Sequence, residues 1–204
     1  MNILVDKFYS KLIFLCVLSF ITMFNRLNYS PIGYDDAFYA QRSKELLYNK
    51  DYFFITPTYN YKIRFDNKPP IIYWFLALSG KLFGFENWSM RIFPALFGFV
   101  NVLFAFFIVS KFFNDSRFGF FVGFILNFTQ QFIYYSRSAT PETIFCLFFW
   151  LSLFSFIYVE KTKKYKYLLL TGTFIGLAIM TRQLFGFLIY IIYLYYNFHL
   201  YFFI

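Results

Sequence analysis

Three short polar segments of this 204-residue chain combine residue types that act on hydroxyl and phosphate groups. The first contains two adjacent carboxylates, Asp35 and Asp36, within GYDDAFYAQRSKELL. A carboxylate within hydrogen-bond reach of a hydroxyl group serves as a general base. The apolar residues that follow predict a short amphipathic helix over 33–47, whose dipole favours negative charge in its first turn. The pair is therefore either catalytic or a helix-terminal feature, and its residue types alone leave both interpretations open.

The second segment is DNKPP, which places Asp66 and Lys68 directly before an apolar run at 71–84. A lysine at this boundary could bind the phosphate of a lipid headgroup as a point charge. It could also end a loop, with its ammonium group reaching the membrane surface.

The third segment, SRSATPET, contains Arg137 and Glu142. One interpretation is structural: Thr140 caps a helix, Pro141 takes its first position, Glu142 lies in its first turn and pairs with Arg137. The other interpretation gives the two charged residues a role in binding.

The elements that position these segments are membrane helices. Hydrophobic residues make up 60% of the chain and charged residues 14%, whereas a soluble domain has about 45–50% and about 25%. Apolar runs of spanning length predict an all-α, polytopic transmembrane fold with about six spans. They lie at 8–26, 92–113, 118–135, 143–159, 167–181 and 183–204. The run at 71–84 is too short to span and is expected to be a juxtamembrane helix.

The basic residues indicate an orientation. Lys7, Lys11, Lys111, Arg117 and the lysines of 161–166 fall on one side of the predicted spans, which should be the cytoplasm. The N-terminus is then cytoplasmic, and 27–90 forms a long first outer loop. This distribution accounts for the net charge of +9, so we expect no nucleic-acid partner.

Small residues suggest one further packing surface. Gly172 and Gly176 form a small-xxx-small pattern, which is typical of close helix packing in membranes.

The order of these motifs resembles a known family. The acidic pair is followed by KPP, then FGFENWSMRIFPALFG (83–98), SRSATPE and AIMTR (178–182). Together they resemble the N-terminal portion of GT-C type polytopic membrane glycosyltransferases. The closest branch is the dolichyl-phosphate-mannose-protein mannosyltransferase-like group (glycosyltransferase family 39-like), which includes bacterial lipid A aminoarabinose transferases.

The resemblance implies a function. Such enzymes are hexosyl- or pentosyltransferases that move a sugar, with inversion, from a polyprenyl-phosphate carrier to an acceptor on the outer face of the membrane. The acceptor is lipid A, another glycan or a protein, and the bacterial inner membrane is the expected location. We therefore expect 1–204 to be the N-terminal part of such a transferase domain, with its C-terminal half absent.

The resemblance also implies site residues, residue by residue. Asp35 and Asp36 match the family's catalytic acidic pair, and Lys68 and Arg137 match residues that bind the donor phosphate. Glu142 and Asp66 are candidate ligands of a divalent metal or of the donor.

Two positions depart from the family pattern. Some relatives carry an acid where this chain has Asn67, and a lysine is common where it has Arg182. No cofactor is certain from these residues, and a divalent metal cation is the one candidate. The alternative to a transferase is a non-catalytic membrane protein or an inactive fragment.

Overall fold

The structure is a computed structural model that describes residues 2–29, 33–50, 52–53, 68–183, 188, 191–192 and 194–195, with backbone alone over 2–7. These residues form helices and no strands, which confirms the predicted all-α fold. The elements are α1 (Asn2–Phe24), α2 (Tyr34–Asn49), α3 (Ile71–Phe83), α4 (Asn87–Phe113), α5 (Ser116–Phe128), α6 (Gln130–Ser136), α7 (Glu142–Thr162), the 3₁₀ turn η1 (Tyr165–Tyr167) and α8 (Leu168–Ile179).

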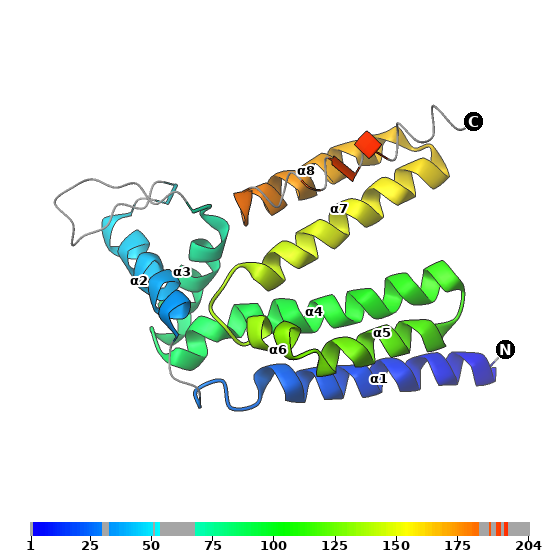
Figure 1. Ribbon diagram of the computed structural model, residues 1–204, viewed down its shortest axis with the longest axis horizontal. Coiled ribbons are helices and arrows are strands. Elements are labelled where there is room, and N and C mark those ends of the chain that lie inside the picture. Colours follow the sequence, from blue (N-terminus) through cyan, green and yellow to red (C-terminus); the bar gives the residue numbers. More distant parts are fainter. Residues whose placement is uncertain are drawn as a thin grey trace.

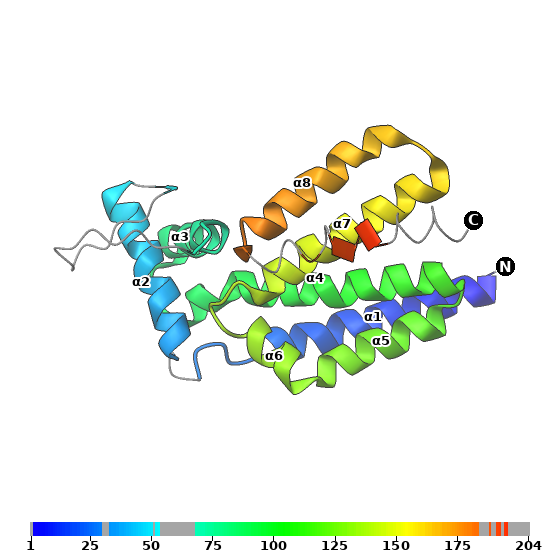
Figure 2. The same ribbon diagram turned by 45° about the horizontal axis from the view of Figure 1, so that its top comes forward.

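Helix α4 is the centre of the arrangement. It contacts α1, α3, α5, α6 and α7. Figures 1 and 2 show α1, α4 and α5 side by side, α7 and α8 as an antiparallel pair, and the short helices α2 and α3 together at one end. The N-terminus and the α4–α5 turn lie at the opposite end.

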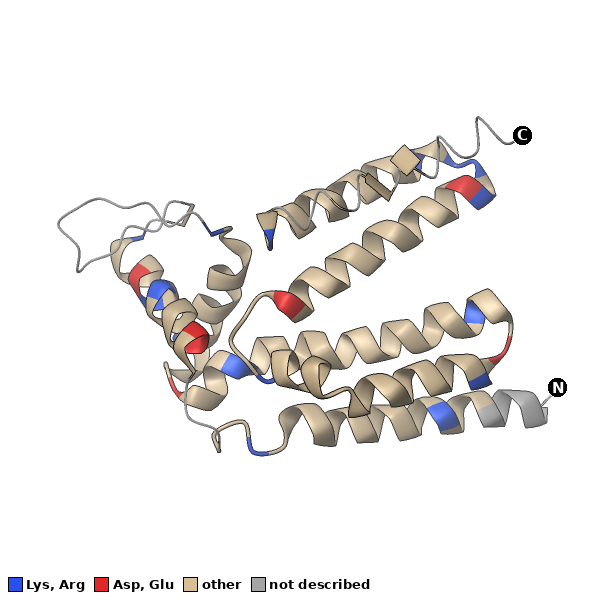
Figure 3. Ribbon diagram, viewed as in Figure 1, with Lys and Arg blue, Asp and Glu red and all other residues tan. Residues whose placement is uncertain are grey.

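Two long apolar helices match predicted spans. Helix α4 has 27 residues and α7 has 21, and both are long and apolar enough to cross a membrane. At 1.5 Å per residue they measure roughly 40 and 32 Å. The charged residues in Figure 3 gather toward the two ends of the helices, and residues 92–110 and 143–159 contain none. The full number of spans stays a prediction.

The starts and ends of these helices follow local chemistry. Glu86 is the N-cap residue of α4 and forms a capping box with Ser89. In it, the Ser89 hydroxyl oxygen accepts a hydrogen bond from the Glu86 backbone N–H at 3.0 Å. Helices α2, α4 and α7 end at Lys50, Asn114 and Lys163, each in the left-handed conformation that stops a helix.

The sequence predicted one span at 118–135. In the structure this segment is divided into two helices, α5 and α6. Thr129 between them has an extended backbone, with φ −74° and ψ 108°. Its hydroxyl group donates to the Ile125 carbonyl oxygen at 2.9 Å, which satisfies one of the acceptors left at the end of α5. The predicted span at 183–204 lies mostly outside the described residues.

Close packing between α4 and α5 depends on a glycine. A Cβ atom on Gly119 would overlap the Phe106 carbonyl oxygen and the Ser110 hydroxyl of α4. By contrast, nothing in the described part of the chain lies within 4 Å of a Cβ built on Gly172 or Gly176. The predicted packing surface on 172–176 is therefore not seen among the described residues, whereas Gly119 allows a close contact between α4 and α5.

We expect Gly119→Ala to lower the free energy of unfolding by about 1–3 kcal/mol, because the added methyl group meets backbone that cannot move aside easily. Denaturant titration of the detergent-solubilised chain measures this. Gly172→Ala makes the same change in an open helical position and should be neutral or slightly stabilising. Equal losses in the two variants would contradict the packing argument.

Candidate functional site

The end of the molecule that carries α2 and α3 collects most of the predicted site residues. Asp35 and Asp36 lie in the first turn of α2, after Gly33 at the N-cap position. This confirms the predicted helix, although the side that it buries includes Asp36, Ser43 and Glu45. Asp35 is exposed to solvent and Asp36 is buried. The two neighbouring carboxylates therefore have different surroundings.

Asp36 forms a buried ion pair with Arg91 of α4. Its Oδ2 atom accepts hydrogen bonds from Arg91 Nε at 3.2 Å and Arg91 Nη2 at 3.0 Å, and its Oδ1 atom accepts one from the Ala139 backbone N–H at 3.0 Å. Arg91 also donates to the Leu27 carbonyl oxygen at 2.9 Å. One arginine thus joins the end of the α1 segment, the start of α2 and the start of α4.

Arg91 was not among the residues selected from the sequence. It is 3% exposed, although it is charged and stands at the start of an apolar span. Charged residues at such positions are rarely buried without a partner. The single arginine within WSMRIF could therefore have predicted, from the sequence, that a carboxylate packs against the start of α4.

Arg137 ties the loop before α7 to the end of α1. Its Nη1 atom donates to the Thr22 carbonyl oxygen at 2.9 Å and its Nη2 atom to the Arg26 carbonyl oxygen at 3.4 Å. Partial burial and the nearby charge of Arg91 hold the pKa of the Arg137 guanidinium below its usual value. The predicted pairing of Arg137 with Glu142 is not formed.

Glu142 pairs with Arg182 instead. The Glu142 Oε1 atom accepts a hydrogen bond from Arg182 Nη1 at 2.6 Å, which connects the start of α7 to the residues after α8. Glu142 Oε2 is buried and has no hydrogen-bond partner in the described part of the chain. The charge of Glu142 is therefore held in place with one oxygen unused.

The predicted cap of α7 is wrong by one residue. The N-cap position is Pro141, not Thr140, and no side chain caps the helix. The Thr140 hydroxyl oxygen is buried and, within the described residues, lacks a hydrogen-bond partner. Glu142 lies in the first turn as predicted.

Lys68 lies over α2. Its Nζ atom is 4.4 Å from the centre of the Phe38 ring and 4.6 Å from that of the Tyr39 ring, which are cation–π distances. Phe38 and Tyr39 follow Asp35 by three and four residues and so share its side of the helix. The structure therefore places Lys68 against the second turn of α2, the turn that follows Asp35, although Lys68 and Asp35 are 33 residues apart in sequence. Asp66 lies outside the described residues.

A cavity of about 330 Å³ adjoins the buried ion pair. Gly33, Asp36, Arg91, Arg137 and Ser138 line it together with residues of α6 and Leu27. The described part of this cavity wall has two guanidinium groups and one carboxylate, so an anionic group is the ligand it suits best.

The metal prediction has limited support from the geometry. Within the described residues, no three His, Cys, Asp or Glu side chains come together as a metal site. The unused Oε2 atom of Glu142 is a suitable oxygen ligand for a hard cation. A divalent metal bound by Glu142 and Asp66 therefore stays a prediction.

Comparisons with known proteins agree on one family. The family model of dolichyl-phosphate-mannose-protein mannosyltransferase matches residues 67–200. An uncharacterized protein of Aquifex aeolicus is 31% identical over 171 residues, which are 83% of this chain and 34% of that protein. An undecaprenyl phosphate-alpha-4-amino-4-deoxy-L-arabinose arabinosyl transferase of Pseudomonas savastanoi pv. phaseolicola is 32% identical over 93 residues, 43% of this chain and 17% of the relative.

A solved structure has the same fold. The crystal structure of ArnT from Cupriavidus metallidurans bound to undecaprenyl phosphate matches with a TM-score of 0.64 at 19% identity. The match covers 89% of this chain and 33% of that one. The chain thus spans about a third of the length of the Aquifex relative and of the solved structure.

Proposed function

Because this chain belongs to the dolichyl-phosphate-mannose-protein mannosyltransferase family, we propose that it takes part in transferring a sugar from a polyprenyl-phosphate carrier to an acceptor at the outer face of the membrane. Membership of this family supports a membrane glycosyltransferase activity that uses a polyprenyl-phosphate donor. The sugar is a pentose or hexose. The acceptor is a cell-envelope molecule such as the lipid A part of lipopolysaccharide, another glycan or a protein.

The observation that carries the proposal is the position of Lys68 over Phe38 and Tyr39, in the turn of α2 that follows Asp35. In the transfer, the bond between the sugar C1 atom and the phosphate oxygen breaks, and the phosphate leaves with the electron pair. A bond forms between the acceptor oxygen and C1, and the acceptor proton passes to a base. The lysine ammonium group stabilises the negative charge that develops on the phosphate, and the exposed carboxylate of Asp35 accepts the proton.

Asp36 and Arg137 have supporting roles in this proposal. Both oxygens of Asp36 already accept hydrogen bonds from Arg91 and Ala139, so its carboxylate is best suited to hold Asp35 in position. Arg137 adds positive charge to the wall of the cavity beside the Asp36–Arg91 pair, and this charge would attract the donor phosphate.

The placement of the charges supports the predicted orientation. Lys11 bonds Ser116 at the start of α5, and Lys161 lies 5.7 Å from the Phe112 ring at the end of α4. Three predicted cytoplasmic segments therefore meet at one end, away from α2. We propose that this end is cytoplasmic, that α2 and α3 lie at the outer surface, and that about six spans cross the membrane.

Lys68→Ala tests the proposal. We expect sugar transfer from a polyprenyl-phosphate-linked sugar to fall by about 10²- to 10³-fold, the usual cost of removing one stabilising donor. Undecaprenyl phosphate binding by the same purified chain should weaken in parallel. Lys81→Ala removes an exposed lysine of α3 and should change neither quantity.

The two readouts separate the competing functions. Transfer and binding that are both unchanged in Lys68→Ala would overturn the assignment of Lys68. A wild-type chain that binds undecaprenyl phosphate without transferring sugar would be a non-catalytic fragment with an intact donor site.

A further inference from the structure

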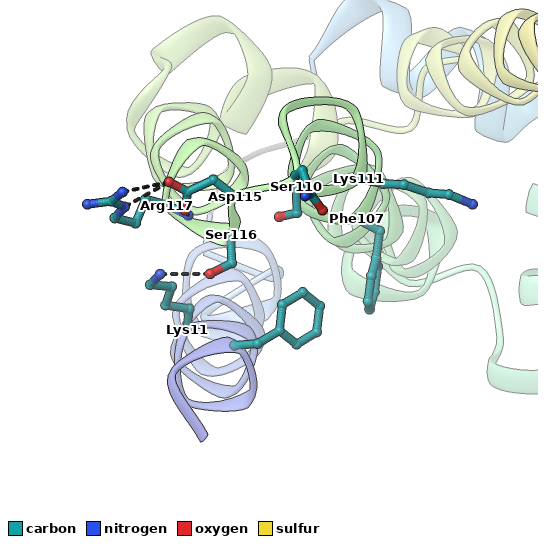
Figure 4. Close-up of a pocket in the computed structure, with 9 residues that line it drawn as sticks. Lys11, Phe107, Ser110, Lys111, Asp115, Ser116 and Arg117 are labelled. Atoms are coloured by element: carbon teal, nitrogen blue, oxygen red, sulfur yellow. Dashed lines mark hydrogen bonds and ion pairs between the residues drawn. The ribbon is translucent and has the colours of Figure 1, made fainter. Parts of the chain in front are cut away.

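A second, larger cavity lies at the opposite end of the molecule from α2 and α3. It has a volume of about 810 Å³, is open to the surface, and lies between α1, the end of α4 and the start of α5 (Figure 4). Its lining residues are Phe8, Lys11, Phe107, Ser110, Lys111, Asn114, Asp115, Ser116 and Arg117. None of them belongs to the candidate site described above.

Positive charge exceeds negative charge around this cavity. Lys11 Nζ donates to the neutral Ser116 hydroxyl at 2.8 Å, and Lys111 Nζ lies 5.9 Å from the Phe154 ring. Within the described residues, neither lysine has a carboxylate oxygen within 4.0 Å. In Figure 4, Lys11 reaches toward Ser116 in the middle of the cavity, and Lys111 extends outward on one side.

The acidic residue at the cavity is already paired. Asp115 accepts hydrogen bonds from the Arg117 backbone N–H at 2.8 Å and from its Nε atom at 2.9 Å. The backbone hydrogen bond is the main cause that lowers the pKa of the Asp115 carboxyl group, so this pair is neutral as a unit at pH 7. Among the described residues that line the cavity, Lys11, Lys111 and Arg117 outnumber Asp115, so the lining has an excess of two positive charges.

The rest of the wall is apolar. Phe8 and Phe107 come from the facing sides of α1 and α4, with their ring centres 6.0 Å apart. Phe107 is 45% exposed, and neighbouring rings of Phe112 and Phe118 are exposed as well. The cavity thus combines a basic rim at the helix ends with an aromatic wall that continues along membrane-type helices. A soluble anion would use only the rim.

We propose that this cavity binds an anionic phospholipid of the cytoplasmic leaflet, with its headgroup phosphate at the basic rim beside Lys11, additional positive charge from Lys111, and its acyl chain along Phe8 and Phe107. Basic pockets between membrane helices on the cytoplasmic side recognise headgroups in this way. The lysines act as point charges on the phosphate. This lipid would hold α1 against the α4–α5 turn, and it is separate from the polyprenyl-phosphate donor, which binds at the other end.

Lipid binding to the purified, detergent-solubilised chain tests the proposal by native mass spectrometry. Phosphatidylglycerol should bind more tightly than phosphatidylcholine, which has the same apolar chains without net charge. Each basic side chain near a headgroup contributes about fivefold in affinity, so the Lys11→Gln/Lys111→Gln variant should lose roughly 25-fold. The control is Lys44→Gln/Lys81→Gln, which removes two exposed lysines at the other end and should bind as the wild type does.

A measurement on the unaltered chain covers the case in which the double variant fails to fold. Phosphatidylglycerol affinity should fall as salt is raised, because exposed charges are screened. Equal affinity for the two lipids, or no salt dependence, would overturn the proposal. So would full displacement of the lipid by millimolar inorganic phosphate, which would show a site for free phosphate.

Discussion

Sugar transfer by an Asp35→Asn variant is expected to fall by about 10²- to 10⁴-fold, the range over which a positioned general base contributes to a rate. Asparagine keeps the shape of the side chain but cannot accept the proton of the acceptor hydroxyl group. Asp35 is exposed in the first turn of α2, where an acceptor can reach it. The measurement is the initial rate of transfer from a polyprenyl-phosphate-linked sugar by the membrane-reconstituted chain.

The competing role of Asp35 is to stabilise the start of α2 electrostatically. In that case Asp35→Asn would cost about 0.3–1 kcal/mol of stability and leave transfer unaffected. Asp115→Asn is the matched control, because it makes the same chemical change at the start of α5, far from Lys68. Transfer at the wild-type rate in both variants would remove Asp35 from the active site.

The sequence predicted best what depends on local pattern. The amphipathic pattern after Gly33 and the short apolar run at 71–84 predicted two helices, and the structure forms both as α2 and α3. The charge-free runs at 92–110 and 143–159 likewise became α4 and α7. In each case the residues that decide the structure are neighbours in sequence, so their spacing carries the information.

The break between α5 and α6 was not predictable in the same way. Residues 118–135 are apolar enough to predict one helix, although Asn127, Gln130 and Gln131 are polar residues near the break. In the structure the Asn127 side chain is buried against α1, where it donates to the Ser19 hydroxyl at 3.0 Å and accepts from the Thr22 hydroxyl at 2.8 Å. A contact across 105 or more residues leaves no trace in local periodicity.

Partner choice among the charged site residues has the same origin. The sequence placed Arg137 five residues before Glu142 and suggested that they pair. In the structure, Glu142 instead forms an ion pair with Arg182, 40 residues away, and Asp36 forms one with Arg91, 55 residues away. Such pairs are decided by how α2, α4, α7 and α8 pack, so residue types could identify the charged groups but not their partners.

The largest expected loss of stability follows from the buried partner that the sequence did not reveal. Arg91→Ala should lower the free energy of unfolding by about 3–5 kcal/mol, because the carboxylate of Asp36 stays buried without its main partner. The Leu27 carbonyl oxygen loses a hydrogen bond at the same time. Denaturant titration in detergent, without added phospholipid, measures the change.

Two comparisons separate the burial of this pair from a general effect of losing an arginine. Arg117→Ala removes the arginine of an exposed pair, whose side chain is 76% exposed, and should cost no more than about 1 kcal/mol. Replacing both partners, as Arg91→Leu/Asp36→Leu, removes the unpaired charge and should recover much of the stability lost by Arg91→Ala.

If Asp36 also positions Asp35, that double variant will be stable and still transfer sugar slowly. A double variant that is both stable and fully active would instead limit the ion pair to folding, and a loss below about 1 kcal/mol in Arg91→Ala would contradict its burial.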